Sequence, residues 1–295
     1  MKLINEGAQV VQTFAAPSIY FDHWAIRAFS DDVALQDRLV QLVHRKEATF
    51  VLSAWNMAEF AGPSDPKHAE DAERFLDRLM PNIYLSDFNL EEALRRDDWA
   101  LARDVRAFMP PYRWALKMLG DRSASTAAPL TTQGLLTQAH AERDRLGPFV
   151  DATKQGILEA FQVVKADPAY IEKARKSKPS DPRPRLWVVL SELMRDFTLD
   201  PKAQVETNDV ADLFHAALPV MACDFVLLDA AWVSRVKRLA VRAQEGGYAL
   251  PLAQCFSRRD DGLARFLDAL EAFEKRRIPE TQQDSSAQSR TIEAR

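Results

Sequence analysis

The sequence predicts an α/β protein, with a parallel sheet covered by helices on both faces and interrupted by a mostly helical insertion. Short apolar runs typical of buried strands alternate with segments whose apolar residues repeat at helical spacing. Three such runs come before residue 90, and a fourth begins at Phe225. Between them, from about Leu90 to Phe197, the helical pattern continues without another convincing strand. A stretch of that length indicates an inserted helical subdomain rather than a loop.

The first half of the chain contains three predicted strands. Residues 18–22, SIYFD, form a short buried run that ends in an acid. A second run covers Thr49–Ser53, where Ser53 is placed to cap the helix that follows, and a third covers Asn82–Leu85. Helical periodicity is expected over His23–Phe29, Val33–Val43, Ala54–Phe60 and Pro66–Met80.

The second half restores the strand and helix rhythm after the insertion. An amphipathic helix carries Asp209 and Asp212 in its first turns and leads to the strand Phe225–Leu228. A last short strand, Ala253–Phe256, precedes a helix over about 261–275. The predicted boundaries are 18–100 for the first part of the α/β domain, 101–198 for the insertion, 199–278 for the second part and 279–295 for a disordered tail.

Composition narrows the class of protein. Of 295 residues, 47% are hydrophobic and 28% are charged, which is ordinary for a soluble globular protein. No signal-peptide core and no membrane-spanning apolar run occurs, so we expect a soluble cytoplasmic protein that does not associate with membranes. The net charge of −4 offers no bulk attraction to nucleic acid, which would need a local basic patch. Neither GxGxxG nor a Walker A sequence is present, which argues against a nucleotide-cradling loop.

Four acids stand at comparable structural points. Asp22 ends the first strand, Asp229 follows the fourth, Asp212 lies in the helix before it, and Glu59 lies in the helix after the second strand. Because the carboxyl ends of parallel strands meet at one edge of a sheet, we expect these side chains to converge. Carboxylates without accompanying cysteine or histidine spacing suit Mg²⁺ or Mn²⁺, which prefer oxygen ligands. Such an ion activates water and neutralises charge on a phosphodiester.

Three segments resemble the acidic motifs of the PIN-domain nucleases. They are IYFD (19–22), VLSAWNMAEF (51–60) and NDVADLFHAALPVMACDFVLLDAAW (208–232). The resemblance covers about 18–100 and 200–240, which is less than half of the chain. It implies a Rossmann-like, PIN-like sheet and Mg²⁺- or Mn²⁺-dependent endoribonuclease activity. The implied substrate is RNA, with single strands favoured, and an antitoxin or another protein is the implied partner. A homodimer, a toxin role and a housekeeping role all remain open.

The resemblance also implies the site residues. Asp22 matches the aspartate of the first strand, and Glu59 matches the glutamate of the helix after the second strand. Asp212 matches the aspartate of the following D-x-x-H-A-A-like helix, and Asp229 matches the acid after the last core strand. These four are the predicted catalytic residues and metal ligands. Asp224 matches an acid that some branches carry before that strand, and the sequence leaves it open between a fifth metal ligand and a turn residue.

Other polar residues are expected to have structural roles, or their roles are left open by the sequence. Asp209 is expected to begin a helix, where the helix dipole favours an acid. His23 and His215 are expected to make structural hydrogen bonds, and Asn56 is open between binding a water or an acid and an exposed helix position. A basic run before Trp187 is open between gripping a phosphate backbone and forming a solvated linker. The run consists of Lys173, Arg175, Lys176, Lys178, Arg183 and Arg185.

Two other functions compete with the nuclease. The fold could be a non-catalytic module that binds RNA or a protein, although such a module has no need of a costly cluster of like charges. A phosphohydrolase of the haloacid-dehalogenase type would need a second aspartate two places after Asp22, and that position is Trp24. Metal-dependent RNA cleavage is therefore the leading prediction.

Overall fold

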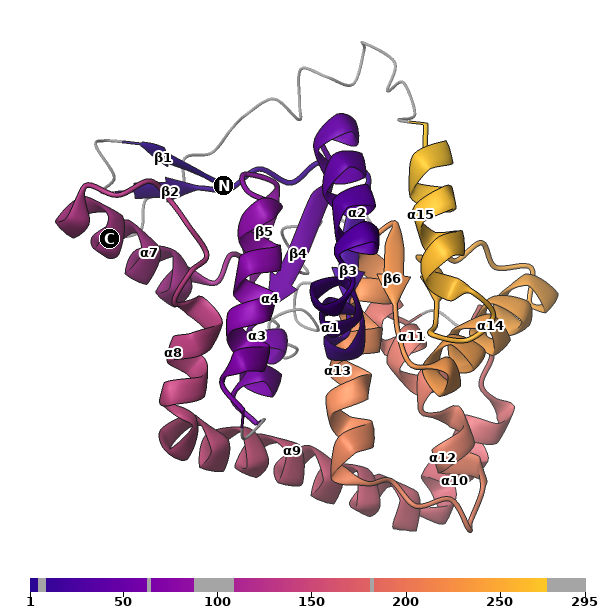
Figure 1. The fold of residues 1–295 in the computed structure, drawn as a ribbon. Helices are drawn as coiled ribbons and strands as arrows, with labels where there is room; N and C mark the ends of the chain where they lie inside the picture. The colour runs from indigo at the N-terminus through magenta and orange to yellow at the C-terminus, as the bar shows by residue number, and fades with distance from the viewer. Residues whose placement is uncertain (5–8, 63–64, 88–108, 181–182, 275–295) are drawn as a thin grey trace.

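The computed structural model describes residues 1–4, 9–62, 65–87, 109–180 and 183–274, and a five-stranded sheet forms its centre (Figure 1). All neighbouring strands of this sheet are parallel, in the order β5-β4-β3-β6-β7. The α/β class and the parallel sheet that the sequence predicts are thus confirmed. The strands are β3 Ser18–Phe21, β4 Thr49–Ser53, β5 Ile83–Ser86, β6 Phe225–Leu227 and β7 Gln254–Phe256.

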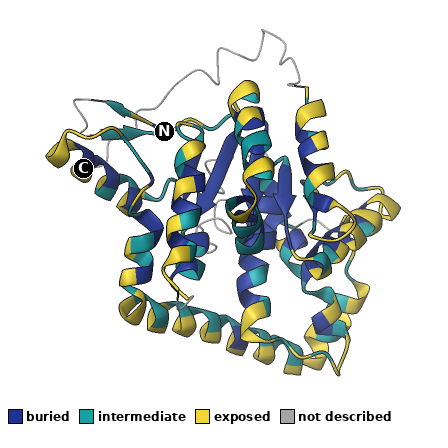
Figure 2. Cartoon of the chain, viewed as in Figure 1, coloured by how far each residue is buried: buried dark blue, intermediate teal, exposed yellow. Residues whose placement is uncertain are grey.

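Both faces of the sheet are buried (Figure 2). Successive side chains of a strand point to opposite faces, so Ile19 and Phe21 join one apolar cluster and Tyr20 joins the other. In β4, Phe50 and Val51 divide between the two clusters in the same way. Because neither face meets water, each strand reads as a nearly unbroken apolar run in the sequence.

Helices cover each face, as the sequence predicts. The face that carries Phe21 packs against α1 His23–Asp31, α2 Val33–Lys46, α4 Lys67–Arg78 and α15 Gly262–Ala272. The face that carries Tyr20 packs against α11 Arg185–Leu193, α13 Thr207–Ala222 and α14 Ala230–Glu245. Helix α3, Ala54–Phe60, follows β4 directly.

The segment between β5 and α13 is mostly helical in its described part. Figure 1 shows α9 running along the lower side of the molecule, from α8 to α10. Helix α8 packs on α3 and α4, whereas α9 packs on α13. Residues 88–108, where part of the predicted helical run falls, and the predicted disordered tail at 279–295 lie outside the described residues. The remaining helices are α7 Arg113–Thr126, α8 Leu135–Ala141, α9 Arg143–Ala166, α10 Pro168–Lys176 and α12 Arg195–Leu199.

The sequence did not predict the amino-terminal hairpin. Strands β1, Lys2–Ile4, and β2, Gln9–Val11, pair antiparallel in a separate two-stranded sheet. Their side chains are mostly half-buried, so the segment lacks the apolar run that marks the central strands. Across the part of the chain that the structure describes, no helix combines the length and apolar character needed to cross a membrane.

Gly262, the first residue of α15, is required by a close backbone contact. A Cβ atom at this position would lie 1.7 Å from the carbonyl oxygen of Ser257. Gly262→Ala is therefore expected to lower the free energy of unfolding by about 2 kcal/mol or more in urea denaturation, because the backbone must shift. Gly156→Ala is the matched control, since a Cβ there meets nothing within 4 Å inside α9. It should raise stability by roughly 0.5 to 1 kcal/mol. Equal stability of the two variants would contradict the tight contact.

Candidate functional site

The acids gather where the order of the strands reverses. From β3 the chain moves to β4 and β5 on one side, and it later returns to β6 on the other side of β3. Ligands of open parallel sheets bind in the crevice at such a point, beyond the carboxyl ends of the strands. Asp22 directly follows β3, and its backbone N–H donates to the carbonyl of Leu227 at 3.0 Å. Asp229 follows β6 by two residues, so the two acids lie at the same edge of the sheet.

Helix α3 brings Glu59 close to Asp22. Ser53 and Asn56 form a capping box, in which the Ser53 hydroxyl accepts from Asn56 N–H and the Asn56 side chain accepts from Ser53 N–H. The Asn56 amide also donates to the carbonyl of Phe21 at 2.9 Å. Asn56 is completely buried, so it is not the exposed helix position that the sequence left open, and its side chain bonds to Ser53 and Phe21. It fastens α3 to the strand that carries Asp22.

The four predicted residues form two groups that share Asp22. One group contains Asp22, Asp212 and Asp229, and the other contains Asp22, Glu59 and His215. Within each group, one ligand atom from each residue lies within 4.8 Å of the others. Asp22 is buried, Asp212 and Glu59 are partly buried, and Asp229 is exposed. The structure therefore brings together acids that lie up to 207 positions apart in the chain.

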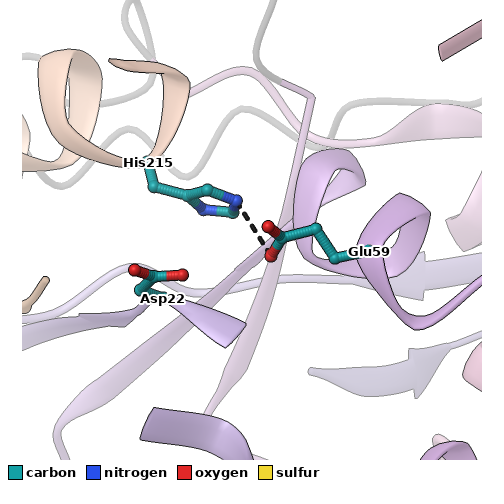
Figure 3. Close-up of side chains that lie close together, drawn as sticks. All are labelled: Asp22, Glu59 and His215. Carbon is teal, nitrogen blue, oxygen red and sulfur yellow. Dashed lines mark ion pairs between the residues drawn. The ribbon is translucent and has the colours of Figure 1, made fainter. Parts of the chain in front are cut away.

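His215 is paired through both ring nitrogens. Its Nδ1 lies 2.5 Å from the Tyr20 hydroxyl, and its Nε2 lies 3.0 Å from Oε2 of Glu59 (Figure 3). The second contact is an ion pair whose N–H is not well aligned for a hydrogen bond. Burial would lower the pKa of His215, but the charge of Glu59 outweighs it, with help from Asp22 and Asp212, and raises this pKa to about 9. The structural hydrogen bond predicted for His215 is present as its contact with the Tyr20 hydroxyl, and the ring also carries a positive charge.

The same charges set the state of the acids. Burial raises the pKa of Asp22 to about 7, and the nearby Glu59, Asp212 and Asp229 carboxylates add to the rise, although the charge on His215 opposes it. Burial likewise raises the pKa of Asp212 to about 6. Burial would also raise the pKa of Glu59, but the charge and contact of His215 more than offset this and leave it lowered. Glu59 is thus ionised at neutral pH, while Asp22 holds a proton part of the time.

The group of three aspartates has the chemistry of a divalent metal site. It offers only carboxylate oxygens, which Mg²⁺ and Mn²⁺ prefer. Burial raises the pKa of Asp22, the neighbouring carboxylates add to the rise, and a cation would relieve their repulsion. The group with His215 fits less well, because a protonated imidazole has no lone pair for a metal. Asp22, Asp212 and Asp229 therefore fit an ion, with Glu59 next to them.

The structure places Asp224 apart from these groups. Asp224 precedes β6, and its Oδ2 accepts from the backbone N–H and the hydroxyl of Ser18, at 2.7 and 2.9 Å. Ser18 begins β3, whereas Asp22 follows its end, about 13 Å away at the rise of a strand. Of the two readings that the sequence left open, the turn residue is the one this position supports. Asp209 lies in the first turn of α13, as expected of a helix-start residue, and it accepts from the N–H of Glu206 in a capping box.

The basic run does not form one surface. Arg185 is buried and donates to the carbonyl of Met221 at 2.8 Å, at the end of α13. Arg175 and Lys176 pair with Glu172 on their own helix, at 2.8 and 3.0 Å. At least these three members are engaged within the protein, so the run as a whole does not have the form of a phosphate grip.

Two residues at the site were missed by sequence reasoning. Tyr20 places its hydroxyl between Ser53, at 3.1 Å, and His215. Trp232, in the first turn of α14, donates its indole N–H to Oδ2 of Asp212 at 2.9 Å. The sequence does contain a signal for each of them: the tyrosine lies inside a buried strand, and the tryptophan follows Asp229 by one turn. Each has a buried polar atom that needs a hydrogen-bond partner. Which partner each finds depends on the tertiary structure. His23 packs edge-on against Phe60, with ring centroids 4.5 Å apart.

Comparison with known proteins found no match. Neither a protein-family model, nor a curated protein sequence, nor a solved structure matches the chain. The function must therefore be argued from the site itself, together with the motifs that resemble the PIN-domain nucleases.

Proposed function

We propose that this protein is a metal-dependent endoribonuclease of the PIN-like type. The observation that carries the proposal is the group of Asp22, Asp212 and Asp229 at the switch point of the sheet, with Glu59 beside it. Each of these acids stands at the position that the motif resemblance assigns to it. A cluster of like charges at a ligand-binding edge is costly to the fold, which favours a functional reason for it.

The residues divide the work as follows. Asp22, Asp212 and Asp229 would hold a Mg²⁺ or Mn²⁺ ion, with the ionised carboxylate of Glu59 beside them. When bound, such an ion activates water and neutralises charge on the oxygens of a phosphodiester. His215 keeps Glu59 ionised, and Trp232 fixes the orientation of the Asp212 carboxylate.

RNA cleavage with and without metal tests this proposal. Wild-type protein should cleave a generic single-stranded RNA with Mn²⁺ present and should be inactive in EDTA. Asp22→Asn should retain less than about one hundredth of the activity, because loss of a residue that merely supports a metal ligand already costs 10- to 100-fold. The control is Asp224→Asn, which changes the same chemistry at a position outside both groups and should cleave within about threefold of wild type.

Two outcomes would contradict the proposed nuclease activity. One is a wild-type protein that cleaves nothing with Mn²⁺, and the other is an Asp22→Asn variant as active as Asp224→Asn. A protein that binds RNA without cleaving it would instead support the non-catalytic module.

A further inference from the structure

Arg235 lies over two aromatic rings. It lies on α14, six residues after Asp229, and its Cζ is 4.2 Å from the ring centroid of Phe197 and 4.7 Å from that of Trp232. Phe197 belongs to α12 of the insertion, so the guanidinium is held by both parts of the chain. Cation–π contacts of this kind stabilise one orientation of the planar group. Its conformational freedom is thus largely removed before any ligand arrives.

The donors of this guanidinium have no partner among the described residues. The Nε atom is buried without a hydrogen-bond acceptor, and no carboxylate lies within ion-pair distance of the side chain in the part of the chain that the structure describes. Two other arginines of α14 differ. Arg238 pairs with Asp196, and Arg242 pairs with Glu192 at 2.7 Å. A buried, unpaired Nε is unusual, because this donor loses water without gaining an acceptor.

The position of Arg235 links it to the acid cluster. The ring of Trp232, over which the guanidinium lies, is the same ring that donates to Asp212 at 2.9 Å. Asp209 and Asp212 both act electrostatically on Arg235, yet neither pairs with it. The stack on Phe197 and Trp232 holds the positive charge one aromatic ring away from the acids. The site therefore presents fixed carboxylates and a fixed cation side by side.

We propose that Arg235 binds a phosphate of the RNA strand next to the phosphodiester that is cleaved. The guanidinium lies over two aromatic rings, and its unpaired donors match the oxygens of a phosphate, which accept two parallel hydrogen bonds. An RNA strand carries such a phosphate on each side of the scissile one. This substrate-binding role rests on the proposed nuclease function, but it makes separate predictions about affinity.

Affinity and kinetics of matched variants test this role. Arg235→Met keeps the apolar stem and removes the charge, and Arg238→Met removes a charge of the same helix that is paired with Asp196. Binding is measured by fluorescence anisotropy of a labelled single-stranded RNA, in an Asp22→Asn background to prevent cleavage. Arg235→Met should raise Kd about tenfold, as expected for loss of a charged hydrogen bond, and should reduce the slope of log K against log salt by about 0.7. Arg238→Met should leave Kd within twofold of the background and the slope unchanged.

Cleavage kinetics of variants that keep Asp22 should also show a loss of RNA binding rather than a loss of catalysis. Arg235→Met should raise KM about tenfold with kcat within about threefold, and Arg235→Lys should lie between it and wild type because it keeps a charge without the planar fork. If Arg235 only stabilised the fold, Arg235→Met would alter the melting temperature but not the slope of log K against log salt. An unchanged Kd and slope in Arg235→Met would overturn the assignment even if the wild type cleaves RNA. Reduced affinity with no wild-type cleavage would keep the phosphate site and reject the nuclease.

Discussion

Asp22→Asn is expected to make the metal-free protein more stable at pH 8 and to remove its stabilisation by Mn²⁺. Burial and the neighbouring carboxylates raise the pKa of Asp22 to about 7, against about 4 in an unfolded chain. A carboxyl whose folded pKa is raised contributes stability that is complete below about pH 4 and is lost as the pH rises through 7. At pH 8 the folded protein therefore carries an unfavourable charge, which asparagine removes. The gain should be roughly 3 kcal/mol, or about 5 °C in melting temperature.

Wild-type protein should respond to metal in the opposite sense. Mn²⁺ at one hundred times its Kd should stabilise the folded state by about 2.7 kcal/mol at pH 8. The shift should be much smaller at pH 5.5, because Asp22 and Asp212, whose pKa rises to about 6, are then protonated and compete with the ion. Thermal unfolding of wild type, Asp22→Asn and Asp224→Asn at both pH values, with Mn²⁺ and with EDTA, measures these effects. A metal shift that persists in Asp22→Asn would place the ion elsewhere.

His215→Gln is expected to destabilise the protein by about 2 to 3 kcal/mol near pH 6.5. The substitution leaves the Glu59 carboxylate without its cation and takes the imidazole from the hydroxyl of Tyr20, inside a region where His215 is fully buried. Breaking a buried ion pair by removing one partner costs several kcal/mol. The lower end is expected here because the side chain of Glu59 is 20% exposed.

The effect of His215→Gln should shrink at high pH. The pKa of His215 is raised from about 6.5 to about 9, so its contribution to stability is complete below pH 6.5 and is lost as the pH rises through 9. Urea unfolding at pH 6.5 and pH 10 measures the difference, with His44→Gln as the control, because His44 is exposed and contacts only a backbone carbonyl of Arg78. A loss of stability that is identical at the two pH values would show that His215 is not charged in the folded protein.

Much of the fold could be predicted because its signals are local. The strand at Thr49–Ser53 and the helix over Ala54–Phe60 have the predicted bounds, since an apolar run, a serine cap and helical spacing lie within a dozen residues. The hairpin of β1 and β2 was missed because its half-buried side chains produce no such pattern. The third strand begins one residue later than predicted, at Ile83 rather than Asn82.

The candidate site was predictable to the extent that strand ends define it. The sequence determined that Asp22 and Asp229 end parallel strands, and parallel strands bring their carboxyl ends to one edge. It left Asp224 open, because only the tertiary structure shows that this carboxylate accepts from Ser18 at the opposite end of β3 from Asp22. For the same reason the basic run read as one patch, although the fold buries Arg185 against the end of α13.

The sequence by itself therefore determined the class of fold, the acids that end its strands and the helices that carry Glu59 and Asp212. Only the tertiary structure decided their chemical states and partners. Strand and helix periodicity are properties of neighbouring residues, whereas a pKa depends on burial and on charges that are distant in the chain. His215 pairs with Glu59, Trp232 donates to Asp212, and Arg235 lies over the ring of Trp232. These contacts join segments that come together only when the sheet is assembled.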